Sequence, residues 1–165
     1  MRILVLPLLA LSALLAGCSG DADAGLPMPL THADKVALIA SLPEPYRSAD
    51  LANGIFRFQG ICKECHTLGR GSQNLTGPNL FNMFDQVAGA RTDFIYSDAI
   101  KNAGFKWDAE HLQGWLTGPQ TYLPGAKMTF QGLPNEKDRI DLIVYLMTET
   151  GYRTPGMLAA SKPRP

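Results

Sequence analysis

The stretch Cys62-Lys63-Glu64-Cys65-His66 spells Cys-x-x-Cys-His, a spacing typical of covalent c-type haem attachment. Two cysteines three positions apart lie on one face of a helical turn, so each can form a thioether to the same edge of a porphyrin. The histidine that follows directly is then held beneath the ring, where its imidazole can reach the iron. The sequence therefore predicts one covalently bound haem on Cys62 and Cys65, with His66 as an axial ligand.

Two other kinds of site share the Cys-x-x-Cys spacing. A thiol–disulfide oxidoreductase of the thioredoxin type places the pair in a strand-rich βαβ setting, and no strand pattern surrounds residues 56–68. A structural zinc site needs two further ligands at similar spacing, whereas the remaining cysteine, Cys18, lies in a different segment. Both alternatives are therefore weaker than haem attachment.

The composition is that of one ordinary globular domain with additional segments. Of the 165 residues, 45% are hydrophobic and 18% are charged. The formal net charge is zero, so the sequence predicts no nucleic acid or other polyanion as a partner.

The N-terminus has the pattern of an export signal. A short positive start precedes an apolar run over residues 3–16 that is too short to span a bilayer, so residues 1–17 are predicted to be a signal peptide. The segment Leu15-Ala16-Gly17-Cys18 resembles the bacterial lipoprotein cleavage box, which predicts Cys18 as the lipidated N-terminus of the mature chain. The alternative is an ordinary secretory signal that is cut near Gly17.

Cysteine usage supports this assignment, because one cysteine serves the anchor, two serve the haem and none remains for a disulfide framework. We therefore expect a lipid-anchored protein on the periplasmic side of a bacterial membrane, outside the cytoplasm, where c-type haem is attached. Ser19 is compatible with sorting to the outer membrane, but a respiratory role favours the inner membrane.

Sequence patterns divide the chain into a signal peptide (1–17), a lipidated flexible tether with one short helix near 33–42 (18–47), a core domain (48–151) and a loose C-terminal tail (152–165). The expected fold class is all-α. Caps and apolar periodicity predict a first helix from an N-cap at Ser48 to Cys62, short helices over 97–103 and 108–116, and a last helix from an N-cap at Asn135 to Gly151. Gly54 lies inside the first helix against its propensity, which predicts a close helix contact.

Two loops rich in Gly, Pro and Asn, residues 68–77 and 117–134, separate these helices. They are longer than a compact domain of this size normally tolerates. We therefore expect the helices and loops to wrap around the haem, which would supply much of the apolar interior.

Met128 is the best candidate for a second axial ligand. It follows the turn at Pro124-Gly125, which can present a thioether from the other side of the ring. The other candidates have alternative explanations as tether, core, tail or solvated residues: Met28, Met83, Met147, Met157, His32 and His111. A His/Met pair raises the reduction potential relative to two histidines and leaves no open position on the iron for a substrate.

The chain resembles class I cytochromes c of the mitochondrial and bacterial c2 type from about Gly54 to Thr150. Three motifs carry the resemblance: Cys-Lys-Glu-Cys-His-Thr at 62–67, Thr-Gly-Pro-Asn-Leu at 76–80 and Pro-Gly-Ala-Lys-Met at 124–128. The resemblance implies a single all-α domain around one haem. It also implies a hydrogen bond between His66 and the carbonyl of Pro78.

The resemblance has further implications for the packing. Where the first and last helices cross, it implies that Gly54 and Phe58 pack against Leu142 and Tyr145. It also implies that two aromatic residues hydrogen-bond a haem propionate, namely Tyr96 and Trp107.

The sequence departs from the family pattern near the haem. Gln86 stands where the family often has an arginine, and Arg91 is the candidate substitute. Ile100 stands in place of an asparagine, so we expect a drier interior there. Around the exposed haem edge, the positions that match docking lysines are Ile61, Leu75, Gln120, Pro134 and Asn135, with Lys127 retained. Strong electrostatic steering is therefore not expected, and we hypothesise that confinement by the lipid tether replaces it.

The function expected from these features is one-electron transfer by a monomeric, membrane-anchored carrier, not an enzyme, between a quinol-oxidising complex and a terminal oxidase or reductase. A second hypothesis is a dedicated electron-transfer subunit of a periplasmic dehydrogenase or reductase. A third, which requires that Met128 is not a ligand, is a haem peroxidase or sensor with an open iron position.

Overall fold

The structure is a computed structural model and describes residues 27–155 and 157. The predicted signal peptide at 1–17 and the predicted lipidation site at Cys18 lie outside the described residues.

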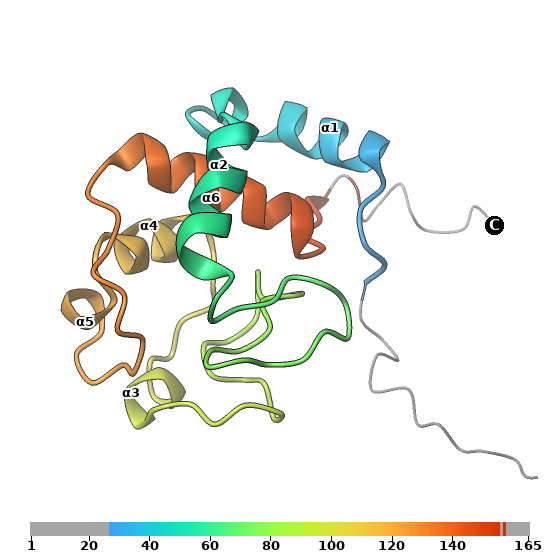
Figure 1. Ribbon diagram of the computed structural model, residues 1–165. Coiled ribbons are helices and arrows are strands. Elements are labelled where there is room, and N and C mark those ends of the chain that lie inside the picture. The colour runs from blue at the N-terminus through green and yellow to red at the C-terminus, as the bar shows by residue number, and fades with distance from the viewer. Residues whose placement is uncertain (1–26, 156, 158–165) are drawn as a thin grey trace, which may run out of the picture.

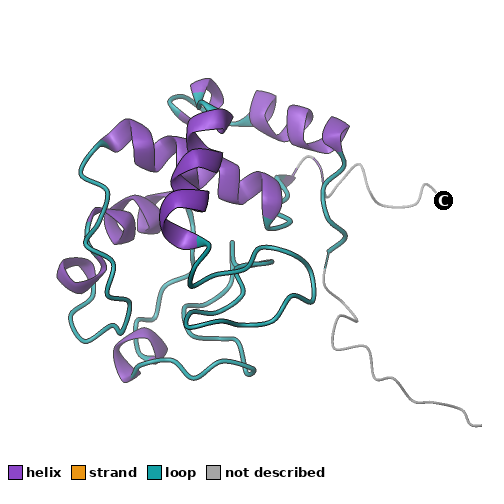
Figure 2. Cartoon of the chain, in the orientation of Figure 1, coloured by secondary structure: helices purple, strands orange, loops and turns teal. Residues whose placement is uncertain are grey.

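The described part of the chain is helical, which confirms the expected all-α class. Its helices are α1 (His32–Ser41), η1 (Tyr46–Ser48), α2 (Leu51–Arg57), the π-helical η2 (Phe58–Cys62), α3 (Asp98–Lys101), α4 (Ala109–Thr117), α5 (Pro119–Tyr122) and α6 (Glu136–Glu149). No β-strand occurs in residues 27–155, where Val87 and Lys106 form an isolated antiparallel bridge. Helices α1, α2, α4 and α6 gather in one half of the molecule, and loops fill much of the other half (Figure 2).

The first helix of the predicted core domain begins later than expected. Asp50, not Ser48, is the N-cap of α2, and its carboxylate accepts hydrogen bonds from the backbone N–H groups of Ala52 and Asn53 at 2.9 and 3.2 Å. Ser48 lies in the preceding 3₁₀ turn. The Asp50 carboxylate also suits the positive end of the helix dipole. Helix α2 then continues through η2 as far as Cys62, as the sequence predicts.

Helices α2 and α6 cross in contact (Figure 1). At the crossing, a Cβ on Gly54 would overlap the carbonyl oxygen of Asp141, so the predicted close helix contact is confirmed. The rings of Phe58 and Tyr145 pack with centroids 5.7 Å apart. Leu142 on α6 is fully buried. The crossing therefore fixes the position of the helix that leads into the haem motif.

A carboxylate of α6 ties the start of α2 to this crossing. Asp141 is fully buried and accepts hydrogen bonds from the Asp50 backbone N–H at 2.8 Å, from Asn53 Nδ2 at 2.7 Å and from Lys137 Nζ at 2.6 Å. Burial alone would raise the pKa of Asp141. The hydrogen bonds from Lys137, Asn53 and the Asp50 backbone outweigh burial and hold that pKa below its usual value.

The Asp141 contacts predict acid-sensitive stability. Because its pKa is lower in the folded chain, Asp141 adds stability that is fully present above the unfolded pKa of about 4 and is lost as pH falls through the folded pKa. Asp141→Asn should lower the free energy of unfolding by about 1–3 kcal/mol at pH 7 and flatten its fall below pH 4. Guanidinium unfolding between pH 3 and 7 measures both effects.

Asp98→Asn is the matched control, because this carboxylate is exposed and pairs locally with Lys101. It should leave unfolding at pH 7 unchanged. An Asp141→Asn chain as stable as the parent at pH 7, with the same acid profile, would contradict the role of the buried carboxylate.

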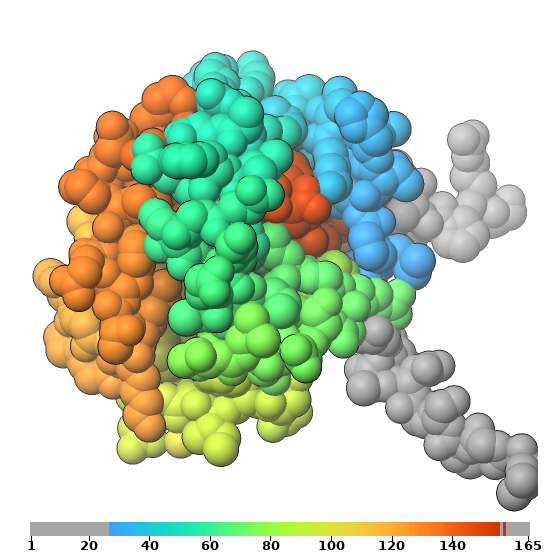
Figure 3. Space-filling view, in the orientation of Figure 1, coloured from blue at the N-terminus to red at the C-terminus, as the bar shows by residue number. Residues whose placement is uncertain are grey.

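Part of the predicted flexible tether is wrong, because α1 packs on the domain. Its N-cap Thr31 forms a reciprocal capping box with Asp34. Leu38 on this helix is fully buried within the core cluster, and Lys35 Nζ lies 2.6 Å from a carboxylate oxygen of Glu149 at the end of α6. In the space-filling view α1 lies beside the end of α6, which shows between α1 and α2 (Figure 3). The folded unit therefore begins before residue 48.

The first residues of the predicted loose tail are also packed. The ring of Tyr152 lies 5.0 Å from that of Phe84, and Arg153 donates a hydrogen bond to the carbonyl of Met28 at 2.7 Å. The two ends of the described chain are therefore in contact with each other near the end of α6.

The remaining predicted helix starts agree with the structure: Ser97 caps α3, Asp108 caps α4 and Asn135 caps α6. The predicted loop at 117–134 is not entirely irregular, because it contains the short helix α5.

Candidate haem site

A cavity of about 610 Å³ lies between the helices and the loops. Protein interiors rarely leave empty space larger than a water molecule, and cavities of this size are typical of cofactor sites. All the residues that sequence reasoning assigned to the haem line this cavity: Cys62, Cys65, His66, Pro78, Tyr96, Trp107 and Met128. The cavity and its sulfur and imidazole donors therefore fit a haem.

The imidazole of His66 is held in one orientation. Its Nδ1 lies 2.8 Å from the carbonyl oxygen of Pro78, which confirms the hydrogen bond implied by the resemblance. Because a carbonyl oxygen only accepts, Nδ1 carries the proton and Nε2 keeps its lone pair for a metal. Burial lowers the pKa of His66, although its bond to Pro78 opposes this, so the ring favours the neutral form that a ligand requires.

Gly77 leaves room for this ring. A Cβ at position 77 would overlap three atoms of the His66 imidazole. Glycine is therefore required here because the His66 ring lies against the backbone of residue 77. The sequence alone indicated only that residues 76–80 resemble a loop of the family.

The two cysteines lie on a tight turn, and no disulfide joins them. The backbone N–H groups of Cys65 and His66 donate to the carbonyl of Cys62 at 3.0 and 2.9 Å. Burial, with a smaller contribution from Cys65, raises the pKa of the Cys62 thiol to about 11. Thiol–disulfide oxidoreductases require a lowered pKa, so this environment disfavours that alternative.

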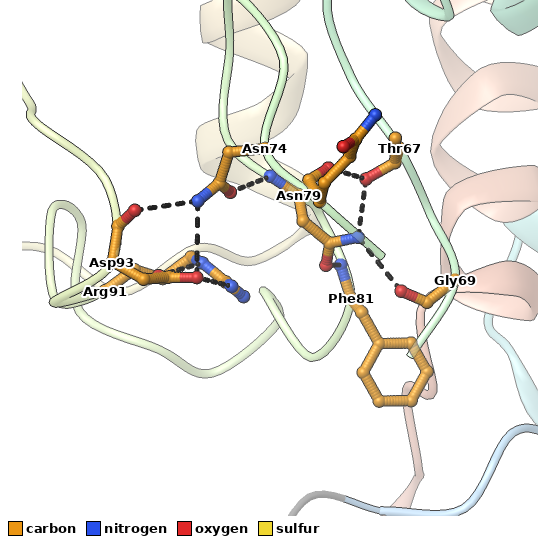
Figure 4. A network of polar contacts seen from close by, with 8 residues as sticks. Thr67, Gly69, Asn74, Asn79, Phe81, Arg91 and Asp93 are labelled. Carbon is orange, nitrogen blue, oxygen red and sulfur yellow. Dashed lines mark hydrogen bonds and ion pairs between the residues drawn. The ribbon is translucent and has the colours of Figure 1, made fainter. Parts of the chain in front are cut away.

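A buried amide braces the loop that carries Pro78 (Figure 4). Asn79 is 2% exposed, and its Nδ2 donates to Thr67 Oγ1 at 2.7 Å and to the Gly69 carbonyl at 2.9 Å. Its Oδ1 accepts from the backbone of Phe81, and its own backbone N–H donates to Asn74. Asn79 therefore stabilises the loop on both sides of Pro78. Sequence reasoning assigned it no role, because an asparagine in a loop resembles an ordinary turn residue.

Met128 and Met83 both contribute to the cavity wall. Met128 is half-buried on the loop after α5, where Gly125 has a φ of +89°. Met83 was expected in the core, and the structure places it at the cavity as a second thioether. Two thioethers therefore border the cavity, one from each of these residues.

The other ligand candidates lie elsewhere. Met147 is 4% exposed and lines a separate, smaller cavity. His111, expected to be solvated, is half-buried: its ring stacks on that of Phe105 at 4.3 Å, and its Nδ1 bonds Asp108 at 2.8 Å. Two further ligand candidates, Met28 and His32, are exposed in the N-terminal segment.

The two aromatic residues assigned to the propionates are half-buried at the cavity. Burial raises the pKa of Tyr96, so its hydroxyl remains a hydrogen-bond donor at neutral pH. The indole of Trp107 packs edge-on against Trp115 at 5.3 Å. Arg91 also lines the cavity and forms an ion pair with Asp93 at 2.6 Å.

The two residues that depart from the family pattern line the cavity. Gln86 and Ile100 both line it, and Ile100 is 7% exposed. An apolar side chain at position 100 is consistent with the expected drier interior.

Some residues of the expected docking face are exposed, and others make hydrogen bonds within the domain. Ile61 and Leu75 are each 37% exposed, and Lys127 is exposed. Asn135 caps α6, and Gln120 turns its amide toward the loop of Met128. Sequence reasoning missed Ile95, which is 87% exposed at the cavity rim.

A helical domain that gathers two cysteines, an imidazole and a thioether around one cofactor-sized cavity defines a haem-binding domain for electron transfer. No family model matches the chain. It is 45% identical to a cytochrome c of Theileria annulata over 107 residues, which are 63% of this chain and 92% of the relative. A cytochrome c2 of Rhodoblastus acidophilus is 46% identical over 85 residues, which are 52% of this chain and 79% of the relative.

A cytochrome c of Kluyveromyces lactis is 35% identical over 106 residues, 64% of this chain and 96% of the relative. The chain belongs to the class I cytochrome c family. It is accordingly an electron carrier, not an enzyme, and its cofactor is one covalently bound haem c.

Proposed function

We propose that this cytochrome carries one electron at a time in a respiratory chain, between a quinol-oxidising complex and a terminal oxidase or reductase, as a lipid-anchored protein on the periplasmic side of the membrane. The main observation in support of this proposal is that Cys62, Cys65, His66 and Met128 all line the same cavity. Cys62 and Cys65 would form the thioethers to the haem, and His66 and Met128 would hold its iron.

When bound, the haem supplies a one-electron iron couple. The chain's own residues hold and shield it. The Pro78 carbonyl orients His66, and the Asn79 contacts brace the loop that bears this carbonyl. Ile100 and Trp107 line the cavity with apolar surface, which limits entry of water. If His66 and Met128 both hold the iron, no position would be left on it for a substrate, and the haem would exchange electrons with a partner at the rim of the cavity.

Replacing each cavity methionine in turn tests the axial ligand. Met128→Leu should abolish the sulfur-to-iron absorption band of the oxidised protein and lower the reduction potential, because the thioether favours reduced iron. Met83→Leu is the matched control and should keep both the band and the potential. A redox titration of the visible spectrum measures both quantities. Loss of the band in Met83→Leu but not in Met128→Leu would overturn the assignment, as would its persistence in both variants, which would show that another sulfur holds the iron. Absence of the band from the parent protein would favour an open iron position.

The membrane location rests on the N-terminal sequence alone. The signal-like residues 1–17 and Cys18 support a lipid anchor, and the inner membrane is preferred because its quinol-oxidising complexes would supply the electrons. Within residues 27–155, no helix is both long and apolar enough to cross a bilayer.

The apolar rim favours a second candidate function, a dedicated subunit of a periplasmic dehydrogenase. Ile95 and Val87 are 87% and 46% exposed beside the cavity, and exposed apolar side chains suit a permanent partner. Recovery of the chain with a large enzyme from detergent-solubilised membranes would favour this candidate over a mobile carrier.

A further inference from the structure

Gln120 lies on α5 and turns its side chain toward the loop that carries Met128. Its Nε2 donates a hydrogen bond to the carbonyl of Met128 at 2.8 Å and another to the carbonyl of Ala126. We propose that Gln120 is a positioning residue: its amide clamps the methionine loop closed, and so slows the opening that would take Met128 away from the cavity.

The chemistry of the contact requires the amide nitrogen. Both partners are backbone carbonyls, which only accept, and a glutamine amide nitrogen carries two hydrogens. Each carbonyl therefore receives one hydrogen. The side-chain orientation follows from its partners, because a flipped amide would place its oxygen against two carbonyl oxygens.

Helix α5 is a firm base for this clamp. Pro119 is almost fully buried, and the backbone N–H groups of Tyr122 and Leu123 donate to Gly118 and Pro119 at 2.9 Å each. The ring of Tyr122 lies so close to Gly114 on α4 that a Cβ there would overlap it. Gln120 is thus attached to a turn that packs closely on the helical half of the domain.

The loop has few other polar ties. Ala126 and Leu133 donate backbone hydrogen bonds to Leu123 and Leu116 at 3.1 and 2.7 Å. Between them, within the described residues, no backbone N–H of residues 127–132 has a backbone partner. Segments with few hydrogen bonds open locally at low free energy. The two bonds from Gln120 are therefore the main polar link between α5 and the segment that contains Met128.

The inference rests on Met128 as the proposed axial ligand, so two readouts are needed. The first is the rate at which added imidazole replaces the methionine in the oxidised holoprotein, which requires the loop to open. The second is the rate of trypsin cleavage after the exposed Lys127, which reports loop opening whatever binds the iron. Gln120→Ala should raise both rates about tenfold, equivalent to about 1.4 kcal/mol.

Two further variants separate the clamp from other effects. Gln131→Ala is the matched control, because this exposed glutamine of the same loop bonds only its neighbour Thr129, at 3.3 Å. It should leave both rates unchanged. Gln120→Glu keeps the side-chain shape but has no donor when ionised, and should raise both rates at least as much as Gln120→Ala.

The outcomes test the Gln120 clamp and the Met128 ligand separately. Parental cleavage rates in Gln120→Ala and Gln120→Glu would overturn the clamp, as would an equal rise in Gln131→Ala. Faster cleavage without faster imidazole binding would support the clamp and count against Met128 as the ligand. Faster rates in both assays would support both.

Discussion

Gly54→Ala is expected to lower the free energy of unfolding of the holoprotein by at least about 3 kcal/mol, a large share of the stability of a small domain. The added Cβ would meet the backbone carbonyl of Asp141, which cannot move aside as a side chain tip can. Helices α2 and α6 would have to separate, which would loosen the Phe58–Tyr145 ring contact and the Asp141 hydrogen bonds. The thermal midpoint of unfolding should fall by about 10 °C, which differential scanning calorimetry measures.

Gly60→Ala is the control for the loss of a helical glycine. It lies in η2, six positions further along the same continuous helix, and a Cβ there would meet nothing within 4 Å. Alanine also restricts the unfolded chain, so this variant should be as stable as the parent or slightly more stable. Similar destabilisation by the two substitutions would show that close packing at the crossing is not the reason for Gly54.

Gly77→Ala is expected to weaken coordination of the iron by His66 about tenfold to a hundredfold, the usual effect of losing an outer hydrogen-bond partner of a metal ligand. The new methyl group would overlap the imidazole and push it away from the Pro78 carbonyl, 2.8 Å from Nδ1 in the parent. Guanidinium titration followed in the visible spectrum should show loss of the histidine-ligated form at a lower denaturant concentration.

Gly118→Ala serves as the comparison for this variant. Its backbone is extended, with a φ of 172°, and a Cβ there would meet the Thr121 side chain at an ordinary distance of 3.6 Å. It should titrate like the parent. Retention of parental histidine ligation in Gly77→Ala would mean that the loop relaxes without disturbing the ring, contrary to the expectation.

The sequence predicts the helices of this domain well where the signal is local. Asn135 is followed by two acidic residues and an apolar stripe, and the structure shows it capping α6. Gly54 is conspicuous because propensity opposes it, and it lies at the crossing. The first cap was misassigned because Ser48 and Asp50 are both good N-caps, and the choice depends on the Asp141 carboxylate, which accepts the Asp50 N–H from across the crossing.

Other features depend on contacts between distant residues, which a single sequence does not reveal. Residues 32–41 have a weak apolar pattern, so they resembled a tether, yet Leu38 is buried against the domain. Gln120 was expected on a docking face, because position along the chain does not show which way an amide turns. The role of Asn79 was missed for a similar reason, since its side-chain partners lie ten and twelve residues away in the sequence.

If a lipid is attached at Cys18, as proposed above, the packing of α1 would limit how far the domain could move from it. If all of residues 18–47 were free, the chain could extend about 100 Å from the bilayer surface. With the segment from Pro27 onward folded against the end of α6, only residues 18–26 separate the lipid from the domain, a span of at most about 30 Å. In the anchored form proposed above, the domain would be confined to a thin layer with the α6 end nearest the lipid. Its electron donors and acceptors would then be proteins whose redox centres lie at that height, and a soluble partner deeper in the periplasm would have to come to the membrane.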